Sequence, residues 1–186
     1  MLNQSVYTNV SVSKRGYKQV TPSQTIRYDF KNIANNSTVP LNSFYWRDTL
    51  PTSAVRLTKI VTGTWNQRLS YKVVYKTNLH DYRTLADNLS TMKNYSLDAS
   101  SAALGLASNE YVTDFMFVFG TVKAGFAQVD APYIFCWTNS WLNNGYQFTN
   151  RTDVGGLHGG QWIMATDRWV TTVYKPGVTT LPKTGY

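Results

Sequence analysis

The sequence has few of the residues on which most catalytic and metal sites depend. Its 186 residues include one cysteine, two histidines and ten acidic residues, of which only Glu110 is a glutamate. The single cysteine, Cys136, excludes an intrachain disulfide, and its apolar neighbours predict a buried, inert thiol. The histidines lack metal-ligand spacing, and no nucleotide or nucleophile motif is found. The sequence therefore predicts no metal and no cofactor.

Long apolar runs are also missing. No stretch reaches the roughly 18 residues that a membrane-spanning helix needs, and the start does not read as a secretory leader. The net charge of +8 is spread along the chain, without a basic helix or a nucleic-acid motif, which argues against nucleic acid as a partner. No local pair of carboxylates indicates a glycosidase. A secreted hydrolase, with acids that converge only in the fold, stays open as a less favoured alternative.

The chain is rich in aromatic residues and threonine, and many of its segments alternate between apolar and polar residues with period two. Hydrophobic residues make up 42% of the chain and aromatic residues 15%, enough for one packed core. Many short alternating segments separated by turns predict an all-β sandwich. We expect a linker over 1–9, the sandwich over 10–176 and a flexible tail over 177–186. The expected strands are 10–14, 25–31, 43–49, 56–61, 70–75, 111–119, 131–137, 145–154, 161–165 and 168–174.

The stretch 81–107 interrupts this rhythm. It is rich in alanine, leucine and serine, and we expect either short helices around 85–89 and 99–106 or an ordered insertion over one sheet edge.

The chain ends in a motif that resembles the Leu-Pro-x-Thr-Gly sorting signal of Gram-positive surface proteins. The matching residues are Leu181, Pro182, Lys183, Thr184 and Gly185. The resemblance implies that a sortase cuts after Thr184 and joins its carboxyl group to peptidoglycan, which places the protein outside the cell, on the wall. The hydrophobic segment and basic tail of such a signal are absent from this sequence. We therefore expect a piece of a longer surface protein, with a membrane contact only through that missing segment.

Three further segments resemble the conserved-repeat domains of Gram-positive surface proteins. They cover 28–41, the Asp-Thr-Leu-Pro strand end at 46–51, and 145–154. The resemblance implies an immunoglobulin-like β-sandwich similar to collagen-adhesin and pilin domains, with a short partly helical insertion. Some relatives also carry a spontaneous isopeptide bond between a lysine and an asparagine. The residues that would form it here are Lys14 and Asn150, with Asp48 as the catalytic acid.

The alternation of each strand provides a test of this hypothesis. Lys14 shares a face with Val10 and Val12, Asp48 shares one with Phe44 and Trp46, and Asn150 shares one with Tyr146 and Phe148, so all three polar groups should point into the core. Lys31 should face solvent, and Lys18 is a weaker substitute for Lys14. In the simpler alternative, the Lys14 ammonium lies in water, and Asp48 and Asn150 cap turns.

The expected function is that of a wall-anchored surface domain, either a stalk or an adhesin module, without enzymatic activity toward external substrates. A binder of a host glycan, mucin, matrix protein or immunoglobulin is the alternative. An exposed aromatic patch would favour the binder. The candidates for such a patch are Tyr45, Trp65, Trp137 and Trp141.

Overall fold

Twelve strands in two sheets make up most of the chain. The computed structural model describes residues 5–177. The five-stranded sheet contains, in spatial order, β1 (Val10–Arg15), β3 (Thr25–Asn35), β10 (Tyr133–Thr138), β5 (Val55–Val61) and β8 (Ser96–Asp98). The seven-stranded sheet contains β2 (Gln19–Val20), β12 (Gln161–Val173), β11 (Gln147–His158), β4 (Leu41–Thr49), β9 (Val112–Val122), β6 (Ser70–Thr77) and β7 (Arg83–Ser90).

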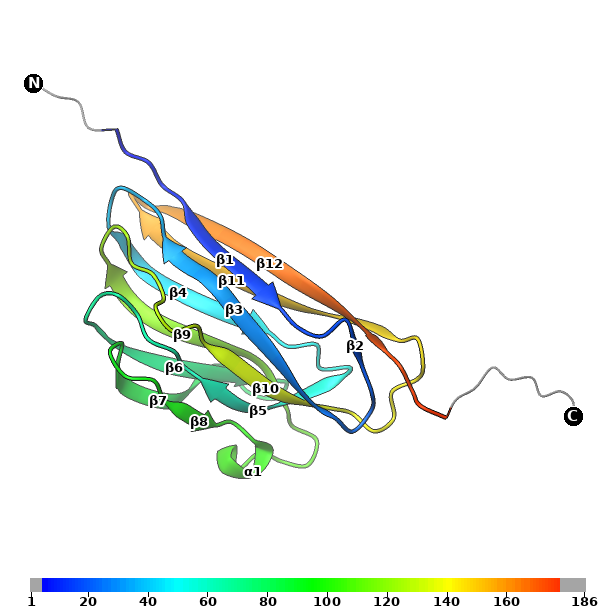
Figure 1. Ribbon diagram of the computed structural model, residues 1–186. Helices are drawn as coiled ribbons and strands as arrows, with labels where there is room; N and C mark the ends of the chain where they lie inside the picture. Colours follow the sequence, from blue (N-terminus) through cyan, green and yellow to red (C-terminus); the bar gives the residue numbers. More distant parts are fainter. Residues whose placement is uncertain (1–4, 178–186) are drawn as a thin grey trace, which may run out of the picture.

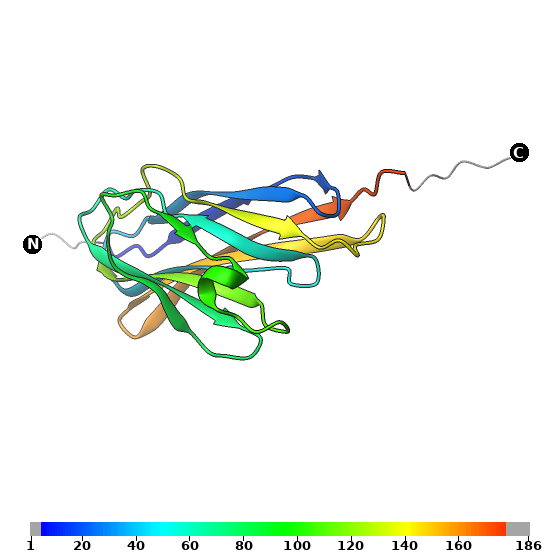
Figure 2. The same ribbon diagram turned by 90° about the horizontal axis from the view of Figure 1, so that it is seen from below.

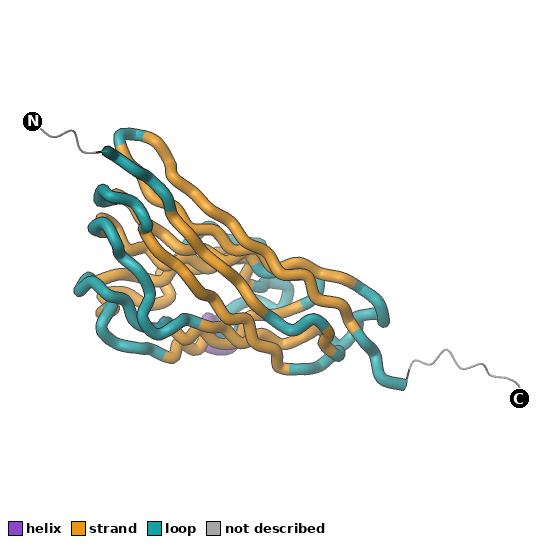
Figure 3. The backbone as a smooth tube through the Cα atoms, turned by 45° about the horizontal axis from the view of Figure 1, so that its top comes forward, coloured by secondary structure: helices purple, strands orange, loops and turns teal. Residues whose placement is uncertain are grey.

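The two sheets face each other and enclose one core, as Figure 1 shows. All strand pairs are antiparallel except the short pairing of β2 with β12. The prediction of an all-β, immunoglobulin-like sandwich is confirmed. The predicted insertion contains one helical turn, α1 (Ser101–Leu104), capped by the Ser100 side chain. Figure 3 shows this turn as the one helical piece of the described chain, with loops at both ends of the strands.

Alternation decides which side chains enter the core. Along β4, Phe44, Trp46 and Asp48 are buried, whereas Tyr45 and Arg47 point to the outer face. The same period places aromatic rings of β9 opposite those of β4, and Trp46 lies 4.6 Å from Phe117 between ring centroids. Neighbouring strands of this sheet therefore pack large rings side by side on the inner face, which buries apolar area in the core.

Two predictions about strand boundaries are wrong. β12 runs without a break from Gln161 to Val173, although a break was expected at 166–167. Asp167 does not end the strand, because its carboxylate accepts a hydrogen bond from the Lys14 backbone amide at 2.8 Å. The expected helix at 85–89 is part of β7, in which Leu89 is buried and pairs with Tyr71. Tertiary pairing overrides the helix preference of alanine and leucine there.

The segment before β1 is partly held in place. In the described part of the expected linker, the backbone amides of Tyr7 and Asn9 donate to the side chains of Thr38 and Ser37. The sorting motif Leu181 to Gly185 lies outside the described residues. No helix within 5–177 has the length and hydrophobicity needed to cross a bilayer.

The chain enters and leaves the sandwich at opposite ends of its long axis. Figures 1 and 2 show the segment before β1 at one end and the end of β12 at the other. A force that pulls the two ends of the described chain apart would therefore act along the strands.

Candidate cross-link site

A buried ion pair joins the two sheets near the start of the chain. Lys14 projects inward from β1 in the five-stranded sheet, and Asp48 projects inward from β4 in the seven-stranded sheet. The Lys14 Nζ lies 3.0 Å from Asp48 Oδ1, and both side chains are 0% exposed. The predicted inward orientation of both residues is confirmed.

Asn150 is the third polar group in this region. It lies in β11, two residues before Thr152, which pairs directly with Asp48, so Asn150 and Asp48 share the inner face. Its amide neighbours the Asp48 carboxyl group and the Tyr28 hydroxyl. Yet the Asn150 Oδ1 and Nδ2 and the Asp48 Oδ2 are buried without a well-formed hydrogen bond to any residue in 5–177. An unsatisfied buried amide of this kind is costly.

Aromatic rings close the site to water. The Lys14 Nζ lies 4.2 Å from the ring centroid of Tyr28 and 4.1 Å from that of Phe30. The Tyr28 ring itself packs against Gly16, where a Cβ atom would lie only 2.7 Å from Tyr28 Cδ1. Glycine at position 16 therefore lets the ring cover the lysine. Sequence reasoning missed Tyr28 as part of the site, although its place between Ile26 and Phe30 signalled an inward ring.

Burial shifts both ionisable groups toward their neutral forms. Loss of solvation lowers the pKa of Lys14, and the nearby Asp48 carboxylate partly opposes this shift. Loss of solvation likewise raises the pKa of Asp48, opposed by Lys14. The site therefore favours a neutral amine beside a protonated carboxyl group more than water does. A neutral amine is a nucleophile, and a protonated acid can polarise an amide carbonyl.

The simpler alternative for these residues does not describe the site. Lys14 does not extend into water, and Asp48 and Asn150 do not cap turns, because all three side chains lie in the core. Lys31 and Lys18 are exposed, as expected for Lys31. Cys136 in β10 is buried, and burial raises the pKa of its thiol, so the predicted burial of this cysteine is confirmed.

The four aromatic binding candidates do not form one patch. Trp65 is 2% exposed and stacks on Phe126 with centroids 5.4 Å apart, so its prediction as a surface residue is wrong. It follows Gly63 outside any strand, where no alternation could indicate its direction. Tyr45 lies half-buried on the outer face of the seven-stranded sheet, where its hydroxyl donates to Asp153 at 3.0 Å. Trp137 lies on the outer face of the five-stranded sheet, and Trp141 in the loop after β10.

Sequence reasoning also missed Trp162. It is 50% exposed, and its ring meets that of Tyr45 edge to face, 5.9 Å between centroids. The signal was its alternation with Met164 on the outer side of β12. Elsewhere, no three histidine, cysteine or acidic side chains in the described residues are arranged to hold a metal ion.

Comparison with known proteins gives only distant likenesses. No known protein family matches the chain by sequence, and no curated protein is significantly similar to it. The chain is similar in structure to domains D2 and D3 of the major pilin SpaD from Corynebacterium diphtheriae, with 16% identity and a TM-score of 0.44, over 87% of this chain and 52% of that one. It is also similar to a cohesin module from a Clostridium perfringens ATCC13124 family 33 glycoside hydrolase, with 8% identity and a TM-score of 0.43, over 92% and 99% of the two chains.

A third similar structure is the collagen-binding domain from a Staphylococcus aureus adhesin. It shares 13% identity and a TM-score of 0.35, over 91% of this chain and 99% of that one. These likenesses are too remote to carry an argument about function. Membership of the conserved-repeat family stays a prediction.

Proposed function

We propose that this chain is a β-sandwich stalk module that transmits mechanical force in a bacterial surface protein, locked internally by an isopeptide bond between Lys14 and Asn150. The observation that supports it is the burial of an amine, an amide and a carboxyl group at one point between the two sheets. A buried ion pair and an unsatisfied buried amide destabilise a fold, so we infer that they are kept for another purpose. A reaction between them removes the cost.

The proposed reaction needs only these three side chains. The neutral Lys14 amine attacks the Asn150 Cγ, while the protonated Asp48 polarises the carbonyl oxygen. Asp48 then moves protons from the lysine nitrogen to the leaving group. The bond between Cγ and Nδ2 breaks, ammonia leaves, and a secondary amide joins the two side chains. No oxidant or co-reactant is needed, because an amine and a primary amide give a secondary amide and ammonia.

The cross-link would close most of the chain into a loop. In the chain-entropy treatment of cross-links, a loop of this length stabilises the fold by about 5 kcal/mol. The link would also connect β1 directly to β11, next to β12. A pulling force would then pass from β1 through the amide and bypass the strands between them.

Force spectroscopy tests this function directly. The protein is placed between marker domains and pulled from both ends. In the wild type, the chain between Lys14 and Asn150, about 135 residues, should not extend. In Asn150→Ala it should, which adds about 450 Å to the contour length. Lys31→Ala, a lysine substitution on the exposed face of β3, should behave as the wild type. An equal contour length in the wild type and Asn150→Ala would contradict the proposal.

Attachment to the cell wall is a separate part of the proposal, supported by the terminal motif. A sortase specific for Leu-Pro-x-Thr-Gly, supplied with a glycine peptide, should replace Gly185 and Tyr186 with that peptide. Thr184→Ala should prevent the exchange. Failure of the wild type to react would remove sortase and peptidoglycan as partners, without affecting the cross-link.

A further inference from the structure

A row of aromatic side chains crosses the outer face of the five-stranded sheet. Tyr133, Phe135 and Trp137 alternate along β10, the central strand, and point away from the core that Ile134 and Cys136 enter. Trp137 is 43% exposed. Alternate positions of a strand lie about 6.8 Å apart, so the row is about 14 Å long. The cross-link site lies on the other side of this sheet and does not use these residues.

The row is held in place by its neighbours. The Arg27 guanidinium stacks 3.6 Å from the Tyr133 ring centroid and is fixed by the Asp29 carboxylate at 2.7 Å. The rings of Tyr133 and Phe135 meet edge to face, 5.7 Å between centroids. These rings sit on a strand that is paired on both sides. A ligand would therefore meet a surface that needs little ordering on binding.

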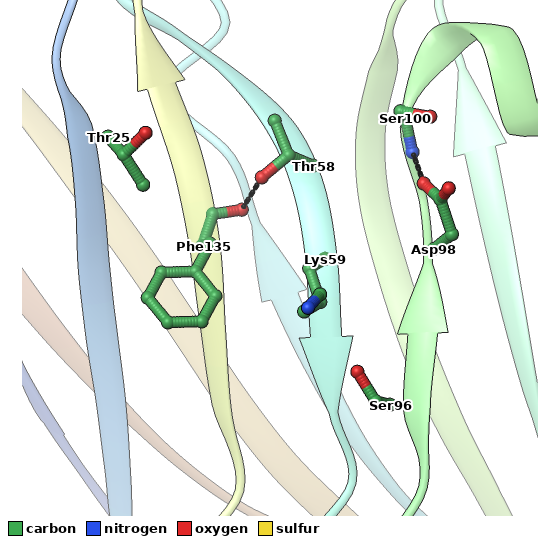
Figure 4. A pocket seen from close by; sticks show the side chains of 7 residues that line it. All are labelled: Thr25, Thr58, Lys59, Ser96, Asp98, Ser100 and Phe135. Carbon is green, nitrogen blue, oxygen red and sulfur yellow. Dashed lines mark hydrogen bonds between the residues drawn. The ribbon is translucent and has the colours of Figure 1, made fainter.

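Beside Phe135 the sheet surface forms a shallow hollow of about 670 Å³, and Figure 4 shows the side chains that line it. The wall contains four hydroxyl groups, one ammonium group and one carboxylate. The residues are Thr25, Thr58, Ser96, Ser100, Lys59 and Asp98.

Lys59 and Asp98 are available to a ligand. They lie opposite each other in the pairing of β5 with β8. Within the described chain, however, the two side chains form no salt bridge, although the strands place them side by side. Asp98 accepts a hydrogen bond from the Ser100 backbone amide, which lowers the pKa of the carboxyl group and keeps it ionised at neutral pH. A donor and an acceptor therefore lie on the same side of the Phe135 ring, on the two strands between it and the sheet edge.

The outer face of the seven-stranded sheet differs from this surface. Its hollow is lined mainly by apolar side chains, including Met116, Val118 and Trp162. The Arg47 guanidinium forms a bidentate interaction with the Asp153 carboxylate, in which Nε donates to Oδ1 at 3.0 Å and Nη2 donates to Oδ2 at 2.9 Å. Arg47 is the one charged residue among those that line this hollow, so the hollow itself presents no free charged group to a polar ligand.

We propose that the outer face of the five-stranded sheet binds a neutral oligosaccharide, which stacks on Phe135 and Trp137 and hydrogen-bonds to Lys59 and Asp98. A sugar ring presents an apolar face to an aromatic ring and hydroxyl groups at its rim, which matches this surface. A purely apolar partner would strip water from Lys59, Asp98 and the hydroxyls without replacing their hydrogen bonds. A polyanion would meet the Asp98 carboxylate beside Lys59, but the same face also carries Arg15, Lys31 and Arg56, so acidic chains are tested beside neutral ones.

The test uses the full chain and a panel of oligosaccharides of four to six units. The panel contains glucose, galactose, mannose and N-acetylglucosamine chains, together with sialylated and sulfated chains, and binding is measured by calorimetry. At least one neutral chain should bind. Trp137→Ala should weaken this binding about tenfold or more, and Asp98→Asn should weaken it several-fold. The matched control is Trp162→Ala, an equally exposed tryptophan on the opposite sheet, which should bind as the wild type does.

Three results would overturn the proposal: no binding to any neutral chain, binding to acidic chains only, or equal losses in Trp137→Ala and Trp162→Ala. Melting curves confirm that each variant is folded. Asn150→Ala should keep its oligosaccharide binding, so failure of this inference and failure of the cross-link give different results.

Discussion

Two regions of the same core are built from opposite kinds of side chain. Around Trp65, five further aromatic rings form a cluster in which neighbouring centroids lie 4.8–6.4 Å apart, and the polar side-chain atoms near them include those of Trp65, Tyr71 and Thr62. The rings are Phe44, Tyr71, Phe117, Phe119 and Phe126. Around Asp48, the core holds an ammonium group, a carboxyl group and an amide, covered by Tyr28 and Phe30. Both regions are fully buried.

The difference shows what each region contributes. The aromatic region stabilises the fold by burying apolar area in favourable ring geometries. The polar region removes charges from water, which destabilises a fold unless the groups are fully satisfied. Conversion of the amine and the amide into a neutral cross-link would make the polar region a second source of stability. Variants in each region separate their contributions to stability.

The largest effect is expected when the cross-link is prevented and the ion pair is kept. Asn150→Ala should lower the free energy of unfolding by about 5 kcal/mol, because the unfolded chain is no longer closed into a loop. Denaturant titration measures the loss, with Lys31→Ala as the control. A loss below about 1 kcal/mol would mean that the wild type carries no cross-link.

A cavity in the aromatic region should have a smaller effect of a different kind. Phe126→Ala removes a ring that packs on Trp65 and Phe119, and should lower stability by about 3–5 kcal/mol. Its mass should still lack one ammonia, since the polar region is intact. A Phe126→Ala protein of full mass would show that the two regions are not independent.

The ion pair itself should destabilise the protein once no amide can form. In the Asn150→Ala background, Lys14→Met with Asp48→Leu should raise stability by about 1–4 kcal/mol, because apolar packing replaces two desolvated charges. Thermal melts of the two variants at one pH measure the difference. A triple variant less stable than Asn150→Ala would contradict this view of the pair.

The same two variants should differ in their pH dependence. Burial raises the pKa of Asp48 above 3.8, so the folded protein binds this proton more tightly, and stability falls as the pH rises from about 3.8 through the folded pKa. Burial lowers the pKa of Lys14 below 10.5, so stability rises again as the pH increases toward 10.5. Asn150→Ala should therefore show a minimum of stability at intermediate pH relative to the triple variant. A constant difference across this range would argue against both shifts.

The smallest effect is expected for an ion pair at the surface. Arg27 and Asp29 are partly exposed, with side chains 40% and 32% accessible. Arg27→Ala should change stability by less than about 1 kcal/mol, because solvent screens the interaction. Denaturant titration beside Asn150→Ala compares the loss of an exposed ion pair with the loss of the proposed cross-link. A loss similar to that of Asn150→Ala would remove the contrast.

Alternation within a strand was enough to predict the direction of Lys14, Asp48 and Asn150, since period two is a local property of the backbone. It did not predict which hydrogen bonds these groups form or which rings shield them from water, because both depend on strands far apart in the sequence. Tyr28 covers Lys14 only because β1 pairs with β3 and Gly16 makes room. Trp65 was misplaced because it lies outside a strand, and the continuity of β12 was missed because Asp167 is satisfied by a distant backbone amide.

Intact-mass measurement of the purified wild-type chain tests the central claim most directly. The account predicts a mass about 17 Da below that of the sequence, the loss of one ammonia. It also predicts a digest in which one peptide pair joins the segments around Lys14 and Asn150, and a full mass for Asp48→Ala. A folded wild-type protein with the full mass of its sequence would contradict the account.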